Sequence, residues 1–351
     1  MTAPKHLLQF LSVLYDSPKA MGIEEFARTN RSFTARSLYR WQAELSDDLI
    51  FYPSVAFRSL GLSTMHLFID DPSPIWREFP YAIRGEWVVS RPGQHTLYLH
   101  CLVPSVHELQ LVAVLRDAEG VTAAKITSIE ARDGWQVLRD FGTSPVSRTP
   151  TIARDQHVWD IVERLPLLIA VIFECVEQGQ SLPAIWESIY ARLGKRTWDY
   201  LPRFARRLPT NGKAYVKECF ALLNHTGLFR QNIIRYRPLN AVGTPMFLRV
   251  EGSELSAIIN AFAEHSPSVD VFPIGDDVAL LRVVSTHELT QHVFSTAANL
   301  PRINDWHFVD ALRNEREPVR PRFAYELLFD PATTEWVFPT EMLQKFRGGT
   351  P

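Results

Sequence analysis

Basic and hydroxyl side chains gather on a predicted helix near the start of the chain. The residues of this helix with groups suited to nucleic acid are Arg31, Ser32, Thr34, Arg36, Ser37, Tyr39 and Arg40. Arginine pairs bidentately with guanine, while serine, threonine and tyrosine hydroxyls reach phosphate oxygens. A helix that enters the major groove of double-stranded DNA carries such groups at its N-terminal end. The pattern predicts DNA contact, and an ordinary solvated helix face is the alternative.

A second basic cluster lies in the middle of the chain. Its members are Lys195, Arg196, Arg203, Arg206, Arg207, Lys213 and Lys217, and among them only Asp199 is acidic. Such a cluster favours salt-dependent contact with phosphates through counterion release. The interleaved aromatic residues, such as Trp198 and Tyr215, are more typical of a core than of base stacking. The alternative is again a solvated surface. Arg28, ahead of the first cluster, is a further candidate for a phosphate contact or a plain surface residue.

Two His-Glu pairs, at His107 and at His287, could suggest a zinc site. A zinc-protease helix needs two histidines four residues apart, so that both lie on one face. The second histidine after His287 is His292, five residues on, and the first copy has none. We therefore interpret both pairs as helix N-termini, with Ser105 and Ser285 as caps and the glutamates near the helix dipole.

Three further histidines, His66, His95 and His100, lie on or beside predicted strands of one sheet and could converge. Cys101 alternates to the opposite face from His100, so the group fails as a metal site. The paired-histidine motif of rolling-circle nucleases is also incomplete. Gly-rich nucleotide-binding motifs and serine-hydrolase elbows do not occur, and nothing assembles a nucleophile, a base and an oxyanion site. The sequence therefore predicts a protein that is not an enzyme, with no metal and no cofactor.

The hydrophobic periodicity predicts helices and strands in an order that occurs twice. Helices over 5–15, near Ile23 to Asn30 and from an N-cap at Ser32, followed by a strand over 49–57, are typical of a winged helix-turn-helix. A βαββαβ pattern, typical of a ferredoxin-like domain, follows, with a helix expected over 108–116. After a Pro/Ser/Thr-rich linker, helices are expected over 157–178, 182–193 and 196–208, and a strand over 228–236. The βαββαβ pattern then recurs, with helices expected over 254–264 and 287–297.

The predicted domains follow chain order. They are a winged helix-turn-helix over 1–58, a ferredoxin-like domain over 59–141, a linker over 142–154, a second and enlarged winged-helix domain over 155–240, and a second ferredoxin-like domain over 241–351. The last ends in a predicted strand pair, 323–329 with 335–338.

Short matches in the same order indicate an internal duplication. Met65 and Met246 are 246 − 65 = 181 residues apart, and so are Leu67 and Leu248. Ser105 and Ser285, each two residues before a His-Glu-Leu sequence, are 180 apart. Because repeats at a fixed spacing change the interpretation of a whole fold, the two halves are expected to share one architecture.

Composition limits the classes of protein that remain. With 351 residues and a net charge of −2, the chain has room for two or more domains and no overall attraction to a polyanion. Its three cysteines show no CxxC spacing, which is typical of a reducing compartment. The longest apolar stretch, Leu165 to Cys175, is too short for a bilayer, and the start lacks a signal-peptide pattern. We expect a soluble, cytoplasmic protein.

The order of elements resembles the Lrp/AsnC (feast/famine) transcription regulators, especially archaeal members with tandem copies. The residues that carry the resemblance are the helix-turn-helix stretch Gly22 to Leu45, the ribbon Asp48 to Phe57 and the strand that starts at Met65. The resemblance implies ferredoxin-like domains that dimerise and bind a small effector, such as an amino acid, between subunits. The helical region over 155–236 is longer than a minimal helix-turn-helix, which leaves its DNA contact open.

Together these patterns predict an α+β protein of two tandem units, each a winged helix-turn-helix followed by a ferredoxin-like βαββαβ domain. The predicted function is sequence-selective binding of double-stranded DNA in transcription regulation, as a homodimer or an intramolecular pseudo-dimer. Two alternatives stay open: a protein-interaction scaffold built on winged-helix domains, and a tandem winged-helix replication initiator.

Overall fold

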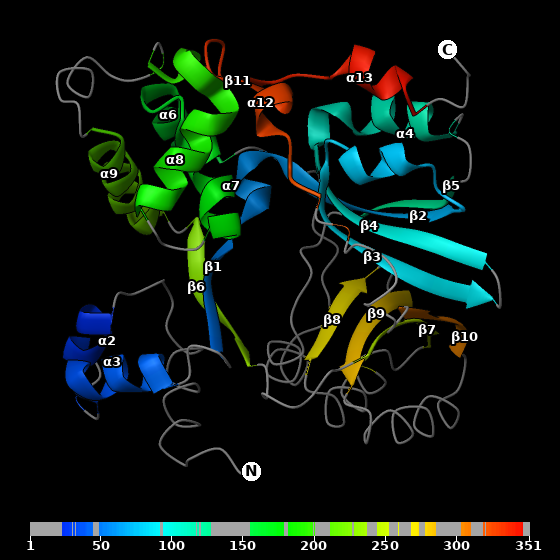
Figure 1. Ribbon diagram of the computed structural model, residues 1–351, viewed down its shortest axis with the longest axis horizontal. Helices are drawn as coiled ribbons and strands as arrows, with labels where there is room; N and C mark the ends of the chain where they lie inside the picture. The colour runs from blue at the N-terminus through cyan, green and yellow to red at the C-terminus, as the bar shows by residue number, and fades with distance from the viewer. Residues whose placement is uncertain are drawn as a thin grey trace. The chain divides into compact units, whose positions relative to one another are not determined.

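Figure 1 shows the chain as a computed structural model. The structure describes residues 23–29, 31, 33–44, 49–91, 94–116, 118, 121–127, 155–178, 182–198, 200, 211–226, 228–236, 244–252, 259, 268–273, 278–285, 303–309, 319 and 321–346. The helices expected over 5–15 and 287–297, and most of those expected over 196–208 and 254–264, lie outside the described residues.

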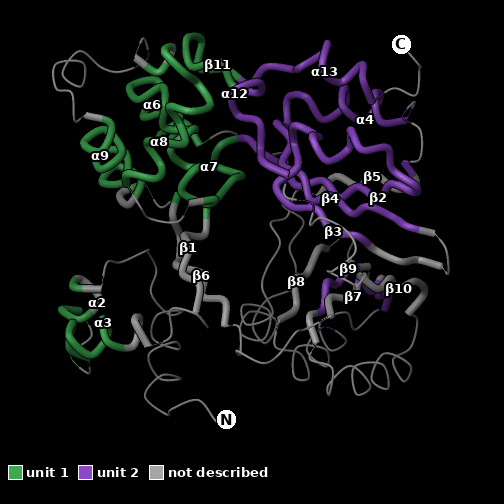
Figure 2. Tube along the Cα trace, in the orientation of Figure 1, with its two compact units in different colours: residues 1–60, 154–240, 329–335 green, residues 61–153, 241–328, 336–351 purple. Residues whose placement is uncertain are grey.

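Helices and antiparallel strands together confirm the prediction of an α+β fold. The chain divides into two compact units, coloured separately in Figure 2. Unit 1 takes residues 1–60, 154–240 and 329–335, and unit 2 takes residues 61–153, 241–328 and 336–351. Each unit therefore draws on both halves of the sequence. The domain boundaries predicted in chain order stay a prediction.

Unit 1 consists mainly of helices. Their bounds are α2 (Ile23–Thr29), α3 (Ala35–Glu44), η1 (Phe57–Leu60), α6 (Gln156–Arg164), α7 (Leu168–Gln178), α8 (Leu182–Leu193), η4 (Gly194–Trp198) and α9 (Asn211–Thr226). Helix α7 is buried along most of its length, from Leu168 to Cys175. A helix that is apolar on all sides belongs in a core, and α7 forms the centre of this one.

The single long helix expected over 157–178 is two helices. Helix α6 ends at Arg164 and α7 begins at Leu168, with Pro166 between them. Proline has no backbone N–H and disfavours helical geometry in the residue before it, so the chain turns there. Asp155 caps α6, because its carboxylate accepts hydrogen bonds from the backbone N–H groups of His157 (3.1 Å) and Val158 (3.4 Å).

A two-stranded ribbon joins the two halves of the sequence within unit 1. Strand β1 (Leu49–Val55) pairs antiparallel with β6 (Phe229–Tyr236), from Leu49 opposite Tyr236 onward. The predicted strands over 49–57 and 228–236 are thus present, and each is the next described element after a helix. Two strands that occupy equivalent places in the repeat are therefore partners of one another.

Unit 2 contains an eight-stranded antiparallel sheet. Its strands are β2 (Leu62–Asp70), β3 (Ala82–Arg91), β4 (Gln94–Pro104), β5 (Val121–Thr127), β7 (Thr244–Glu251), β8 (Ser268–Pro273), β9 (Val278–Ser285) and β10 (Ile303–Val309). The described helical segments of its first half are the 3₁₀ turns η2 (Pro74–Glu78) and η3 (Ser105–His107) and helix α4 (Glu108–Arg116).

The strand order repeats across this sheet. The order is β5-β2-β4-β3-β10-β7-β9-β8. The four strands of each half lie in the same spatial order. The fourth strand along the chain lies first in the sheet, followed by the first, the third and the second. The halves meet where β3 pairs with β10, at Val89 opposite Phe308. The matching orders agree with an internal duplication, while the assignment of tandem winged-helix and ferredoxin-like units remains a proposal.

The C-terminal strand pair is shorter than expected. Of the residues expected as strands, Tyr325–Leu328 form helix α12, and only β11 (Phe329–Asp330) and β12 (Glu335–Trp336) are extended. The carboxylate of Asp330 accepts hydrogen bonds from the backbone of Ala332 and the hydroxyl of Thr333, which fixes the turn. Helix α13 (Thr340–Gln344) follows, and after it Phe346 packs on Trp76 with ring centroids 5.0 Å apart.

Candidate functional site

Helix α3 begins two residues later than the sequence suggested. Thr34, rather than Ser32, is the cap, because its hydroxyl accepts the Ser37 backbone N–H at 3.2 Å. The Ser37 hydroxyl in turn accepts the Thr34 backbone N–H at 3.2 Å and donates to the Thr34 carbonyl at 2.8 Å. This reciprocal pattern satisfies donors that a helix start leaves open. Both hydroxyls therefore hold the start of α3 in place. Ser32 itself lies outside the described residues.

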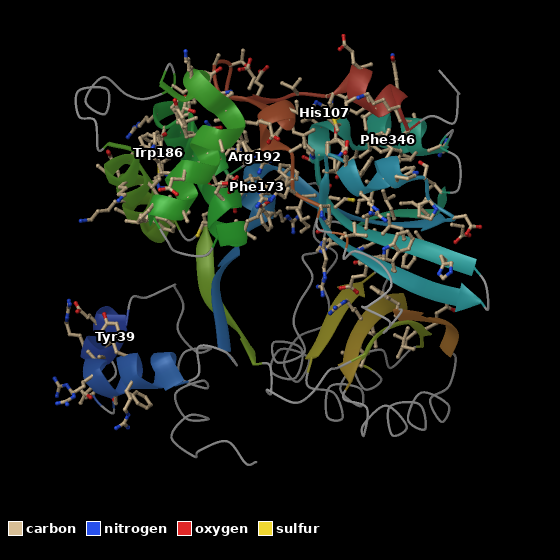
Figure 3. The ribbon with its side chains drawn as sticks, viewed as in Figure 1. Tyr39, His107, Phe173, Trp186, Arg192 and Phe346 are labelled. Atoms are coloured by element: carbon tan, nitrogen blue, oxygen red, sulfur yellow. The ribbon has the colours of Figure 1, made fainter. Side chains whose placement is uncertain are left out.

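Opposite sides of α3 differ sharply in exposure. Phe33 and Leu38 are buried, whereas Tyr39 is 50% exposed. Arg36 and Arg40 are exposed too, as are Arg28 at the end of α2 and Arg31 in the turn between the helices. Helices α2 and α3 pack against one another, and Figure 3 shows their side chains with Tyr39 labelled. The structure thus brings the first predicted cluster together on two adjoining helices.

The second basic cluster is only partly described. Lys195 is exposed on η4, and Lys213 and Lys217 are exposed one turn apart on α9. Arg203, Arg206 and Arg207 lie outside the described residues, as does the side chain of Arg196. Of the interleaved aromatic residues, Tyr215 is fully buried and its hydroxyl accepts the Leu167 backbone N–H at 3.2 Å. Tyr215 is therefore a core residue, as the sequence predicted.

The start of α9 is packed against α8. A Cβ atom added at Gly212 would lie 1.9 Å from ring atoms of Trp186, which belongs to α8 and is labelled in Figure 3. Only a residue without a side chain fits this close approach. Gly212 in the first turn of α9 is therefore covered, whereas Lys213 and Ala214 beside it are exposed.

A group of six residues, all but one of them polar, lies on one face of the sheet in unit 2. Residues directly opposite one another on neighbouring antiparallel strands share a face. His66 of β2, His100 of β4 and Arg84 of β3 form one such row. The next row is Phe68, Tyr98 and Glu86. We call these six residues the polar face.

His66 is the most enclosed member of the polar face. Only 3% of its surface is exposed, and its Nδ1 atom shares a hydrogen bond of 3.1 Å with the Tyr98 hydroxyl. Its ring stacks on that of His100 at 5.2 Å. Burial, followed by the neighbouring His100, holds the pKa of His66 well below its usual value of 6.5. His66 is therefore a neutral imidazole at physiological pH.

An ion-pair network closes the other side of the polar face. Glu86 of β3 accepts Arg84 Nε at 2.6 Å, and it binds Arg282 of β9 through two contacts, at 2.7 and 2.9 Å. Phe247 of β7 packs on Tyr98 with ring centroids 4.4 Å apart. The second half of the sheet thus contributes an arginine and an aromatic ring to a surface built mainly by the first.

The sequence predicted no metal site at the His-Glu pairs or at His66, His95 and His100. Among the described residues, no cluster of three or more His, Cys, Asp or Glu side chains could hold a metal ion. Cys101 is fully buried, and burial raises its pKa. Glu108 accepts a hydrogen bond from the Ser63 hydroxyl, and Ser105 donates to the Gly61 carbonyl at 3.0 Å instead of capping a helix.

Sequence reasoning found part of the polar face and missed the rest. It placed His66 and His100 near one another, and the structure shows their rings in contact. It did not identify Tyr98, Glu86 or Arg282. The alternation along β2 and β4 could have placed Tyr98 beside the histidines. Arg282 lies 196 residues from Glu86 in the chain, and no local pattern predicts that pair.

Comparison with known proteins gives a small number of matches. No protein-family model matches the chain, and no curated protein matches it. The chain is similar to two solved structures of the siroheme decarboxylase NirDL, one of them in complex with an iron-uroporphyrin III analogue. For the complex, identity is 12% and the TM-score 0.44, over 92% of this chain and 96% of that one. For the other structure, identity is 11% and the TM-score 0.45, over 96% and 99%.

These comparisons correct one prediction. The chain was expected not to be an enzyme, and the solved structures to which it is similar over nearly its whole length are those of an enzyme. Separately, no single helix among the described residues has the length and apolar character to cross a membrane.

Proposed function

We propose that the chain binds double-stranded DNA through helix α3. The observation that carries the proposal is the two-sided character of this helix. Leu38 is buried at 2% exposure, while Arg36, Tyr39 and Arg40 point their polar groups to solvent. A recognition helix needs an apolar side that holds it on its domain and a polar side near its start that reaches the bases.

The charge around α3 supports the same contact. Arg28 and Arg31 add two exposed guanidinium groups beside those of Arg36 and Arg40. The chain as a whole has a net charge of −2, so attraction to DNA has to come from a local surface such as this one. Arginine at the helix start suits guanine recognition, and the flanking arginines suit phosphates.

The proposal includes the organisation inferred from the sequence. We take the chain as two tandem units, each a winged helix-turn-helix with a ferredoxin-like domain, that act together as an intramolecular pseudo-dimer in transcription regulation. The repeated strand order in the sheet and the pairing of β1 with β6 support this organisation.

The test compares the Arg36→Ala, Arg40→Ala double variant with the wild type. Each bidentate arginine–base pair contributes about 1–3 kcal/mol of discrimination, so specific affinity for a selected duplex should fall at least tenfold. Lys345→Ala, at an exposed position in the other unit, is the matched control. Unchanged affinity in the double variant, with circular dichroism showing an intact fold, would remove α3 from the interface.

A second function is favoured by the polar face, namely acid–base chemistry on a small molecule. A buried neutral imidazole that shares a hydrogen bond with a phenol can pass a proton to or from a bound compound. Perturbed titratable groups that cluster with charged residues are typical of functional sites. Arg84 and Arg282, on either side of Glu86, suit an anionic group on that compound.

Native mass spectrometry tests this second function. The purified chain, after exposure to a small-molecule extract of its expression host, should carry a bound compound. The His66→Gln, Tyr98→Phe double variant should lose it. A wild-type spectrum without any added mass, or equal loading of wild type and variant, would argue against a small-molecule site on this face.

A further inference from the structure

The two-stranded ribbon of unit 1 pairs equivalent positions of the internal repeat. Tyr52 of β1 pairs with Ile233 of β6, and 233 − 52 = 181. The same separation relates Met65 to Met246 in the duplication. The midpoint of the ribbon therefore joins one position of the repeat to its own copy. An antiparallel contact between equivalent segments is the isologous contact of a two-fold dimer, made here within one chain.

The helices that precede the two ribbon strands occupy matching places. Helix α3 precedes β1, and α9 precedes β6. Leu38 and Cys219, again 219 − 38 = 181 residues apart, are both buried, at 2% and 0% exposure. At this position the buried sides of α3 and α9 correspond, and the same offset relates exposed positions two residues before and after it.

The aligned exposed positions carry different groups. Arg36 corresponds to Lys217, and Arg40 corresponds to Ala221, all four exposed. The exposed stripe of α9 consists of Lys213, Ala214, Lys217 and Ala221. Lysine offers a compact charge without the planar fork that arginine presents to guanine, and alanine has no polar group at all. Among its described residues the stripe suits phosphates and has no arginine, whose planar fork matches guanine.

One side of the first turn of α9 is covered. Gly212 lies against the Trp186 ring, while Lys213 and Ala214 of the same turn are exposed. A recognition helix places its N-terminal residues on the base edges. Among the described side chains of this turn, the exposed ones are a lysine and an alanine, which suit a phosphate contact better than a base contact.

We infer that the two DNA-contacting helices of this chain are unequal: α3 recognises sequence, and α9 contacts only the phosphate backbone through Lys213 and Lys217. The inference rests on the proposed DNA binding by α3. Its consequence is a binding site with one specified half, flanked by a stretch of duplex that is bound without base preference.

The test measures salt dependence and sequence preference separately. Each phosphate contact contributes about 0.9 to the slope of log affinity against log salt. Replacing Lys213 and Lys217 by alanine should thus lower the slope by about 1.8 and leave the motif selected from a randomised duplex library unchanged. The Arg36→Ala, Arg40→Ala variant should lose the motif instead. Lys345→Ala should change neither quantity.

The possible outcomes separate the inference from the proposed function. A wild type that binds no DNA at low salt would overturn both. A wild type that binds with a selected motif, together with a lysine variant whose salt slope is unchanged, would overturn the unequal-helix inference alone. So would a selected motif with two symmetric halves, or a lysine variant that loses half of a motif.

Discussion

Tyr52 and Ile233 are backbone partners in the ribbon, and they are equivalent positions of an internal repeat. A homodimer can make such a contact only between two chains, whereas here one chain supplies both sides. The two sides are then free to differ in sequence. That freedom explains how α3 can keep exposed arginines while α9, in the matching place, has lysine and alanine.

Gly212→Ala should destabilise the protein. Alanine favours a helix over glycine by up to about 1 kcal/mol, yet the added Cβ would meet the Trp186 ring at 1.9 Å. Displacing a packed indole costs about 1–3 kcal/mol, so the clash outweighs the gain in helix propensity. The midpoint of urea unfolding checks the change. A rise in the midpoint would show that α9 does not pack on Trp186 as described.

Breaking the buried ion pair between α7 and α8 should cost more. Arg192 donates to Glu174 at 3.0 Å, and the Glu174 side chain is fully buried. Removing one partner leaves a buried charge, so Arg192→Leu should lose about 3–5 kcal/mol. The double replacement Glu174→Leu, Arg192→Leu should recover much of that loss. The control is Glu163→Ala, at an exposed position of α6. An Arg192→Leu variant as stable as the Glu163→Ala control would contradict the buried ion pair.

Lowering the pH should reduce the stability of the fold, because the unfolded chain gains a proton at His66 that the folded chain does not bind. Its pKa is lowered in the folded state, chiefly by burial and then by His100, so the unfolded chain binds a proton that the folded chain does not. Stability is therefore retained above the ordinary pKa of 6.5 and is lost as pH falls below it, by up to about 1.4 kcal/mol per pH unit.

The His66→Gln variant isolates that effect, because glutamine keeps a hydrogen-bonding side chain and does not titrate. Unfolding measured between about pH 7 and pH 5 should show a smaller loss of stability for the variant than for the wild type. Equal losses would mean that His66 is protonated in the folded protein, against its burial.

Tyr98→Phe should lower the stability of the fold, because it removes the hydrogen bond to His66 on the polar face. The variant keeps the ring that packs on Phe247 and removes the hydroxyl 3.1 Å from His66 Nδ1. An unsatisfied buried nitrogen costs about 1–3 kcal/mol. Imidazole nitrogen shifts in an NMR spectrum should change for His66 as well. Unaltered shifts and stability would place the hydroxyl away from that ring.

Local patterns were enough to predict most of the regular elements. Helices α4 and α8 occupy the predicted ranges, Glu108–Arg116 and Leu182–Leu193, because their apolar spacing is clear and their ends are marked. Pro166 could have divided the helix expected over 157–178, since proline stops a helix by a local steric rule. At the start of α3, the sequence predicted Ser32 as the cap, and only the geometry shows that Thr34 has this role.

Contacts between residues far apart in the chain could not be predicted from the sequence. The pairing of Glu86 with Arg282 and the packing of Tyr98 on Phe247 depend on how the two halves of the sheet meet. The same holds for the packing of Trp186 over Gly212 in the first turn of α9. The division into units drawn from both halves of the chain was likewise absent from a prediction in chain order.

The most direct test of DNA binding is a fluorescence-anisotropy titration of the full chain with random-sequence duplex DNA at about 50 and about 200 mM salt. We predict binding at the lower salt concentration and a loss of affinity of at least tenfold at the higher one, as expected for several phosphate contacts. No binding at low salt, or an affinity that does not change with salt, would contradict the proposed function.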